Sequence, residues 1–156
     1  MTRQTLAEFE STLEARKQIA QNVLVWTNDL CKALKQNYVD DCVRSYERNL
    51  AKAESAWDVE YYTKRIKEIK EHSDYDFVCE SGRKYYKIVM VNNQRSVHAF
   101  IDKKTGEVYK PAGWKSPAKH VRYDLRVIKD REYVMNNCDW AGGCLLYTSP
   151  SPRDDL

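Results

Sequence analysis

The strongest constraint on the fold is the absence of glycine and proline from Thr5 to about His72. Both residues break helices, so a long segment without either favours helical structure. Thr5 and Glu8 have the Thr-x-x-Glu spacing of a capping box, which indicates that a helix starts there. Apolar residues then recur at intervals of three and four, at Leu6, Phe9, Leu13, Ala20, Val23, Leu24, Leu30 and Leu34. The pattern predicts a helical N-terminal region over residues 1–73.

This helical region allows two arrangements. We expect a break at Gln36-Asn37-Tyr38, because Asp40 and Asp41 suit the first turn of a second helix. The apolar stripe resumes at Val43, Tyr46, Leu50, Ala53, Trp57 and Tyr61. A helical hairpin and a single long helix that dimerises as a coiled coil both fit this spacing. We favour the hairpin, because Trp57 and Tyr61 are bulky for a regular two-stranded seam.

From Asp74 onward the apolar residues alternate with polar ones, which is typical of strands. Turn residues separate the alternating segments, and Gly106 suits a left-handed backbone conformation in the last hairpin loop. The pattern predicts an antiparallel meander of strands at 84–91, 96–101 and 107–110, with a further strand at 75–79.

Two short helices are expected after the meander. Ser116 followed by Pro117 looks like an N-cap with proline at the first helical position, which predicts a helix through Leu125. Residues 129–138 are the second candidate. The predicted fold class is α+β: an N-terminal helical hairpin or long helix, a small antiparallel sheet of three to four strands, and one or two short helices. The expected domains are a helical region at 1–73, a basic α+β domain at 74–144 and a disordered tail at 145–156.

Several functional classes find no support in the sequence. No segment approaches the roughly 18 apolar residues of a membrane span, and the N-terminus lacks the layout of a signal peptide. We therefore expect a soluble protein that does not contact membranes. The cysteines form no CxxC pair, so neither a disulfide framework nor a metal site is predicted, and no cofactor is expected. They are Cys31, Cys42, Cys79, Cys138 and Cys144.

Charge is distributed unevenly along the chain. Residues 1–80 contain 12 Lys and Arg against 15 Asp and Glu, a net charge of −3. Residues 81–129 contain 12 against 3, a net charge of +9. This asymmetry indicates that the second half meets a polyanion.

The basic half also contains aromatic residues, a mixture that suits single-stranded or irregular nucleic acid because cations neutralise phosphates and rings stack on bases. If Val97, Ala99 and Ile101 point inward, His98 and Phe100 point outward toward the basic side chains. The candidate nucleic-acid-binding residues are Lys87, Arg95, His98, Phe100, Lys110, Trp114, Lys115, Lys119 and Arg122. The alternative interpretation is a solvated sheet face whose lysines prevent edge-to-edge aggregation.

The segment from Trp114 to His120 adds a second hypothesis. The N-terminus of the helix expected at Pro117, beside Lys115 and Lys119, would present free N–H groups to a phosphate. Ordinary helix capping, with the Trp114 ring packed in the core, explains the same residues.

No catalytic motif stands out, and we predict no catalytic residues. His98 and Asp102 are four apart, with Ser96, Glu107 and His120 nearby in the sequence, so a small hydrolase is the weakest of three hypotheses. A non-catalytic protein-interaction module, host-directed or part of a virion, is the alternative to nucleic-acid binding. In that case the helical half is the interface, either to a protein partner or to a second copy.

Three segments together resemble a family of small uncharacterised proteins of marine bacteriophages. Residues 82–85 read GRKY, residues 95–123 read RSVHAFIDKKTGEVYKPAGWKSPAKHVRY, and residues 139–143 read DWAGG. The resemblance covers roughly residues 80–144. It implies a phage gene product that acts in the host cytoplasm or in the virion, and it implies no activity and no catalytic residues.

The end of the chain differs from everything before it. Residues 145–154 read LLYTSPSPRD, which resembles a translated sequencing adapter at the ends of environmental metagenome genes. We expect this tail to be disordered and to contribute nothing to function.

Overall fold

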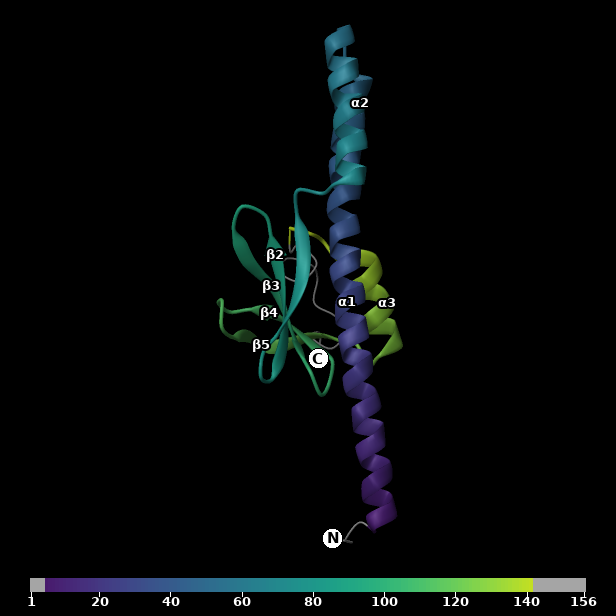
Figure 1. Ribbon diagram of the computed structural model, residues 1–156, viewed down its shortest axis with the longest axis vertical. Coiled ribbons are helices and arrows are strands. Elements are labelled where there is room, and N and C mark those ends of the chain that lie inside the picture. The colour runs from purple at the N-terminus through teal and green to yellow at the C-terminus, as the bar shows by residue number, and fades with distance from the viewer. Residues whose placement is uncertain (1–4, 142–156) are drawn as a thin grey trace.

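A single long helix runs the length of the molecule in the computed structural model, which describes residues 5–141 (Figure 1). A second helix lies beside its C-terminal part, and a five-stranded antiparallel sheet and a short helix flank its middle. The predicted α+β class is confirmed, while the tail expected at 145–156 lies outside the described residues. The elements in chain order are α1 (Leu6–Ala51), α2 (Ala56–Glu71), β1 (Asp76–Ser81), β2 (Tyr85–Val91), β3 (Arg95–Asp102), β4 (Glu107–Pro111), β5 (Pro117–Asp124) and α3 (Ile128–Asn137).

The predicted start of α1 is confirmed, but the break expected at Gln36-Asn37-Tyr38 is wrong. The Thr5 hydroxyl accepts a hydrogen bond from the Glu8 backbone N–H at 3.1 Å, and the Glu8 carboxylate accepts one from the Thr5 N–H at 3.0 Å. The helix then continues through residues 36–38. Asn37 Oδ1 accepts a hydrogen bond from the backbone N–H of Trp140, and the Tyr38 ring packs on the Trp140 ring. These turn-like residues are used for tertiary contacts on the surface of a helix.

The helical hairpin forms later in the chain than the sequence indicates. The connection falls between Ala51 and Ala56, and the Ser55 hydroxyl caps α2 by accepting a hydrogen bond from the Asp58 N–H at 3.1 Å. α2 returns along the C-terminal part of α1 (Figure 1). There Arg65 donates to the Tyr46 hydroxyl at 3.2 Å and lies over the Tyr46 ring.

The sheet has five strands where three to four were expected, because Pro117–Asp124 is the strand β5 and not a helix. The strands follow one another in the order β1-β2-β3-β4-β5. β5 is an edge strand, and proline is tolerated at the first position of such a strand. Val121 and Tyr123 pair with Tyr109 and Val108 of β4. This cross-strand pairing outweighs the local helix-start signal at Ser116, so the segment forms a strand. The helix expected over 129–138 is confirmed as α3.

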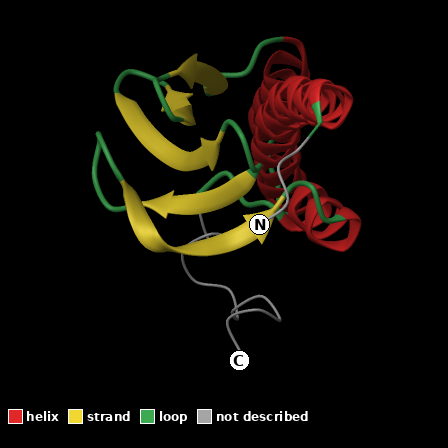
Figure 2. Cartoon of the chain, turned by 90° about the horizontal axis from the view of Figure 1, so that it is seen from below, coloured by secondary structure: helices red, strands yellow, loops and turns green. Residues whose placement is uncertain are grey.

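The hydrophobic core lies between α1 and one face of the sheet. The sheet curves on one side of the helices, as Figure 2 shows. The buried stripe of α1 continues at helical spacing through Val23, Thr27, Leu30 and Leu34. Val23, Leu30 and Leu34 of this stripe pack in one cluster with Leu125 and with strand residues from the inner sheet face, among them Ile88, Ala99, Ile101, Val108 and Tyr123. The burial of this stripe fixes the middle third of α1 against the sheet and leaves its ends projecting.

Gly106 connects the β3–β4 hairpin to this core. Its φ is +74°, a left-handed conformation, and an added Cβ would lie 3.4 Å from Val23 Cγ2 and 3.4 Å from Leu125 Cβ. We expect Gly106→Ala to lower the free energy of unfolding by about 1–2 kcal/mol, measured by urea denaturation. Gly113→Ala is the matched control, because nothing lies within 4 Å of its added Cβ. Equal losses from the two substitutions would contradict this role for Gly106.

Candidate functional site

The outer face of the sheet, opposite the α1-facing side chains, contains a row of residues from four neighbouring strands. The pairing register aligns Glu80 of β1 with Lys87 of β2, Lys87 with Phe100 of β3, and Phe100 with Tyr109 of β4. Residues directly opposite in an antiparallel sheet have their side chains on the same face. The register therefore places one lysine and two aromatic rings side by side.

A pocket of about 440 Å³ opens at this row. The turn between β1 and β2 and the loop before β5 contribute most of its charge, and the strands contribute its rings. Its wall includes Arg83, Lys84, Lys87, Lys115, Tyr85 and Phe100. The carboxylate of Glu80 also lines it and forms an ion pair with Arg95. We call this group of four cations and two rings, together with Trp114, the basic–aromatic pocket.

Cations and rings are in direct contact in the basic–aromatic pocket. Lys87 Nζ lies 4.2 Å from the centroid of the Trp114 ring and 5.7 Å from that of Phe100. The Tyr85 ring meets the Phe100 and Tyr109 rings edge to face, at centroid distances of 5.9 and 6.0 Å. Phe100 is buried under these neighbours, whereas Trp114 is 44% exposed. Trp114 therefore offers the accessible ring, and Lys87 is the cation next to it.

Tyr109 adds no negative charge to this wall. Burial, followed by the nearby Glu107 carboxylate, raises the pKa of the Tyr109 phenol to about 12. The phenol donates a hydrogen bond to Glu107 Oε2 at 3.4 Å and stays neutral at physiological pH. The pocket is consequently dominated by its cations.

Four of the residues predicted from the sequence come together here, namely Lys87, Phe100, Trp114 and Lys115. Arg83, Lys84 and Tyr85 also line the pocket, although none of them was predicted as a site residue. They belong to the GRKY segment, so the signal that could have identified them was the motif itself. Its glycine allows the tight β1–β2 turn in which the Gly82 N–H donates to the Tyr85 carbonyl at 2.9 Å.

The expectation that His98 points outward is wrong. The pairing of β2 with β3 shifts register between Ile88 and Val89, so β3 has one extra residue at His98. The bulge turns the imidazole toward the core, where it is 8% exposed and meets the Phe77 ring edge to face at 5.4 Å. Burial lowers the pKa of His98 to about 4, although Asp139 opposes the shift.

The other predicted cations are dispersed over the sheet. Arg95 forms an ion pair with Glu80 and does not line the pocket, and Lys119 is exposed on β5. Lys110 of β4 and Arg122 of β5 are half-buried. Because residue 117 begins a strand, the phosphate site expected at a helix N-terminus between Lys115 and Lys119 does not exist. The observation that residues 117–124 form β5 thus corrects both the predicted helix and the predicted phosphate site.

The side chains considered for hydrolysis do not form a catalytic arrangement. The Asp102 carboxylate accepts hydrogen bonds from the Lys104 and Thr105 N–H groups, at 2.8 and 3.1 Å, and so stabilises the β3–β4 turn. His98 lies in the core, and His120 is exposed on β5. No cluster of three or more His, Cys, Asp or Glu side chains suited to a metal ion occurs within residues 5–141.

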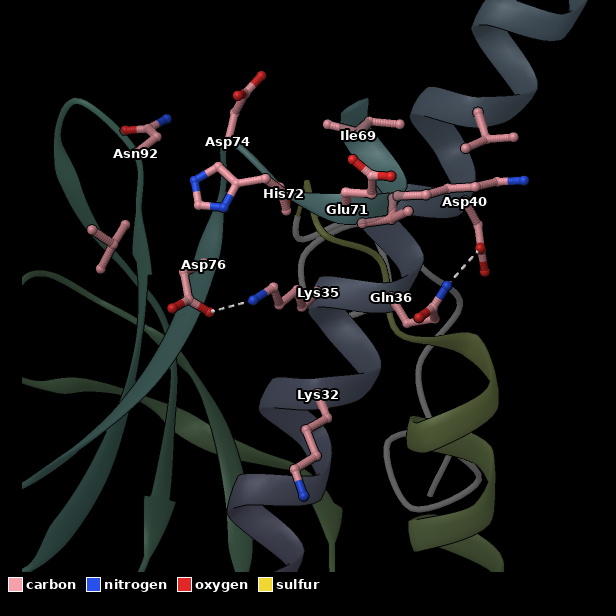
Figure 3. A pocket seen from close by; sticks show the side chains of 15 residues that line it. Lys32, Lys35, Gln36, Asp40, Ile69, Glu71, His72, Asp74, Asp76 and Asn92 are labelled. Atoms are coloured by element: carbon pink, nitrogen blue, oxygen red, sulfur yellow. Dashed lines mark hydrogen bonds and ion pairs between the residues drawn. The ribbon is translucent and has the colours of Figure 1, made fainter. Parts of the chain in front are cut away.

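A larger cleft of about 920 Å³ lies where α2 ends and β1 begins, and Figure 3 shows its lining. Its walls contain both signs of charge. Lys35 forms an ion pair with Asp76 at 3.6 Å, and Gln36 donates a hydrogen bond to Asp40 at 2.8 Å. Glu71 and Asp74 add further negative charge to the lining, and Lys32 and Lys70 add positive charge. Because the charges compensate, this cleft is a weaker site for an anion than the basic–aromatic pocket.

The comparisons with known proteins identify the family. A family model described as Family of unknown function (DUF7717) matches residues 6–148, so the chain belongs to this family. The match includes the long helix as well as the sheet. No curated protein and no solved structure matches the chain. In the part of the chain that the structure describes, no helix is both long enough and apolar enough to cross a bilayer.

Proposed function

We propose that this member of the DUF7717 family binds nucleic acid through the basic–aromatic pocket, and that it does so as a phage accessory protein in the host cytoplasm or the virion. The phage assignment is supported by the resemblance of residues 80–144 to marine phage proteins. The nucleic-acid assignment is supported by the chemistry of the pocket. No cofactor takes part in the proposed binding.

The observation that carries the proposal is the contact between Lys87 and Trp114 at 4.2 Å, with three further cations around the same pocket. Lysine and arginine bind phosphate oxygens and release condensed counterions. An exposed indole gives a base a flat surface on which to stack, and stacking tolerates any sequence. Since the indole of Trp114 lies against Lys87 of the pocket lining, a single nucleotide unit would meet both its phosphate and its base partners there.

The first test is fluorescence anisotropy of labelled oligonucleotides with the full chain, titrated with salt. We expect affinity to fall log-linearly with salt concentration. The double variant K87E/K115E should weaken binding at least about tenfold and reduce the salt slope by about two units, one for each lost phosphate contact. The exposed pair on α2 provides a control with the same charge change, K64E/K67E, which should retain binding within about threefold.

Two outcomes would overturn the proposal. One is no binding at about 50 mM salt, where electrostatic contacts are strongest. The other is an equal loss in both double variants, which would mean that net charge and not the pocket determines binding. Lys115 is exposed, so K115E alone repeats the test without disturbing the core. Circular dichroism of each variant checks that the fold is intact.

One observation favours the alternative function, a protein-interaction module. Trp57 and Tyr61 stack at a centroid distance of 5.3 Å and an interplanar angle of 8°, and both are exposed near the hairpin tip together with Val59. Exposed aromatic residues of this kind are typical of protein interfaces. W57S should leave oligonucleotide binding unchanged, and a partner that requires Trp57 would support the module.

A further inference from the structure

The N-terminal part of α1 projects from the body of the protein as a lone helix. Below the sheet and α3, no other described element covers it (Figure 1). Every side chain from Leu6 to Gln18 is exposed or half-buried, including two large apolar ones, Leu6 at 73% and Phe9 at 45% exposure. We call residues 6–20 the arm. At 1.5 Å per residue its length is about 22 Å.

The arm extends a helix that is already nucleated by its packing on the sheet, but from Leu6 to Gln18 no packing on the described core adds to the small free-energy gain of each further helical residue. The arm nevertheless begins with a complete capping box at Thr5 and Glu8. This cap stabilises the helical conformation of the arm at a distance from the sheet, where the helix packs on no other described part of the same chain. A preformed helix with an exposed apolar face of this kind is suited to packing against a partner.

The apolar residues of the arm continue the buried stripe of the same helix. Val23, Thr27, Leu30 and Leu34 face the core at alternating intervals of four and three. Extending that spacing toward the N-terminus leads to Ala20, Leu13, Phe9 and Leu6, which are positions a and d of a heptad repeat. Arg16 occupies the remaining d position, so one charged residue interrupts the apolar seam of the arm.

We propose that the arm forms an antiparallel coiled coil with the arm of a second copy of this chain. The charges beside the stripe select both the partner and its direction. Glu10 and Lys17 occupy successive e positions, and in an antiparallel pair the e positions of the two helices face each other. Glu10 of each copy then meets Lys17 of the other. In a parallel pair these positions would face Thr5 and Thr12, which provide no opposite charge.

The intrachain contacts of the arm leave its charged side chains available. The only ion pair recorded among the described residues of the arm joins Lys17 to Glu14 at 3.8 Å, and both side chains are largely exposed. Exposed pairs of this kind contribute little to stability. Lys17 can therefore leave Glu14 and pair with a carboxylate of a second copy at a small cost in free energy. The interface is short, and we expect association in the micromolar range. This inference is independent of the proposed nucleic-acid binding.

The test is the oligomeric state of the full chain by sedimentation equilibrium over a range reaching about 200 μM. We expect a monomer–dimer equilibrium that F9E weakens at least about tenfold. S11E is the matched control, because it adds the same charge to the opposite face of the arm and should leave the equilibrium within about threefold. Ile19 is the one arm residue that packs against the core among the described residues, and neither Phe9 nor Ser11 does, so both variants should keep the unfolding midpoint of the sheet.

A charge exchange tests the orientation. E10K and K17E should each weaken the dimer, and the double variant E10K/K17E should restore it, because the antiparallel pairs are re-formed with reversed sign. A wild-type chain that stays monomeric over the whole range would overturn the proposal. A dimer that F9E and S11E affect equally would place the interface elsewhere, and failure of the double variant to restore association would exclude the antiparallel arrangement.

Discussion

Leu34→Ala is expected to lower the free energy of unfolding by about 2–5 kcal/mol, which is a large part of the stability of a domain this size. Leu34 is 0% exposed and lies in the buried stripe of α1, in the core cluster with Ile88 and Ile101 of the sheet. Truncation removes apolar burial and leaves a cavity that a helix fixed at both ends of the interface closes only in part. Urea denaturation followed by circular dichroism measures the loss.

Leu24 provides the matched control for this prediction. It belongs to the same helix, but it is 40% exposed and absent from the core cluster. Leu24→Ala should cost less than about 1 kcal/mol, because little apolar surface is lost from the interior. If the two substitutions cost the same, the sheet would not be packed on the face of α1 that contains Leu34, and the arrangement described here would be wrong.

The second large effect is a loss of stability in mild acid that depends on His98. Burial lowers the pKa of His98 from 6.5 to about 4. Its Nε2 has no hydrogen-bond partner among the described residues, so a proton added there gains no compensating contact. Between about pH 6.5 and pH 4 the unfolded chain binds a proton that the folded chain does not, and stability therefore falls as the pH falls. Over this window the loss amounts to about 3 kcal/mol.

His98→Leu isolates this effect from the titration of the carboxylates. Both proteins share every other titratable group, so the difference between their stabilities should change by about 3 kcal/mol between pH 6.5 and pH 4, in favour of the variant at low pH. Equilibrium unfolding at several pH values measures the difference. Parallel stability curves for the two proteins would show that the imidazole is accessible to solvent and would contradict the buried bulge position.

Much of the architecture follows from local signals. The capping box at Thr5 predicts the start of α1, and the alternating pattern predicts β2, β3 and β4 close to their observed bounds. These signals depend on a few neighbouring residues, and no distant contact competes with them. The predictions failed where contacts with residues distant in sequence determine the secondary structure of a segment. The turn-like residues 36–38 stay helical because Trp140 packs on them, and residues 117–124 form a strand because β4 offers a partner edge.

The candidate site likewise combines features that the sequence predicts with features that only tertiary contacts determine. Lys87, Phe100, Trp114 and Lys115 were predicted from the basic and aromatic composition of the second half, whereas Arg83, Lys84 and Tyr85 were not. The polyanion partner that this composition indicates stays a prediction. The assembly of the cations and rings into one pocket depends on the register of β1 to β4 and on the loop that brings Trp114 onto Lys87. His98 was misplaced because a bulge of one residue reverses the face of a strand side chain, and no alternation pattern reveals such a bulge.

For this protein, the sequence by itself determined the helical and β halves, the start of the long helix and the basic character of the second half. These depend on residue spacing and charge, which are properties of the chain before it folds. Only the tertiary structure decided where α1 ends, that a fifth strand completes the sheet, and which four cations share a pocket. Those outcomes depend on contacts between residues distant in sequence, whose free energies outweigh the small local preferences of a turn or a cap.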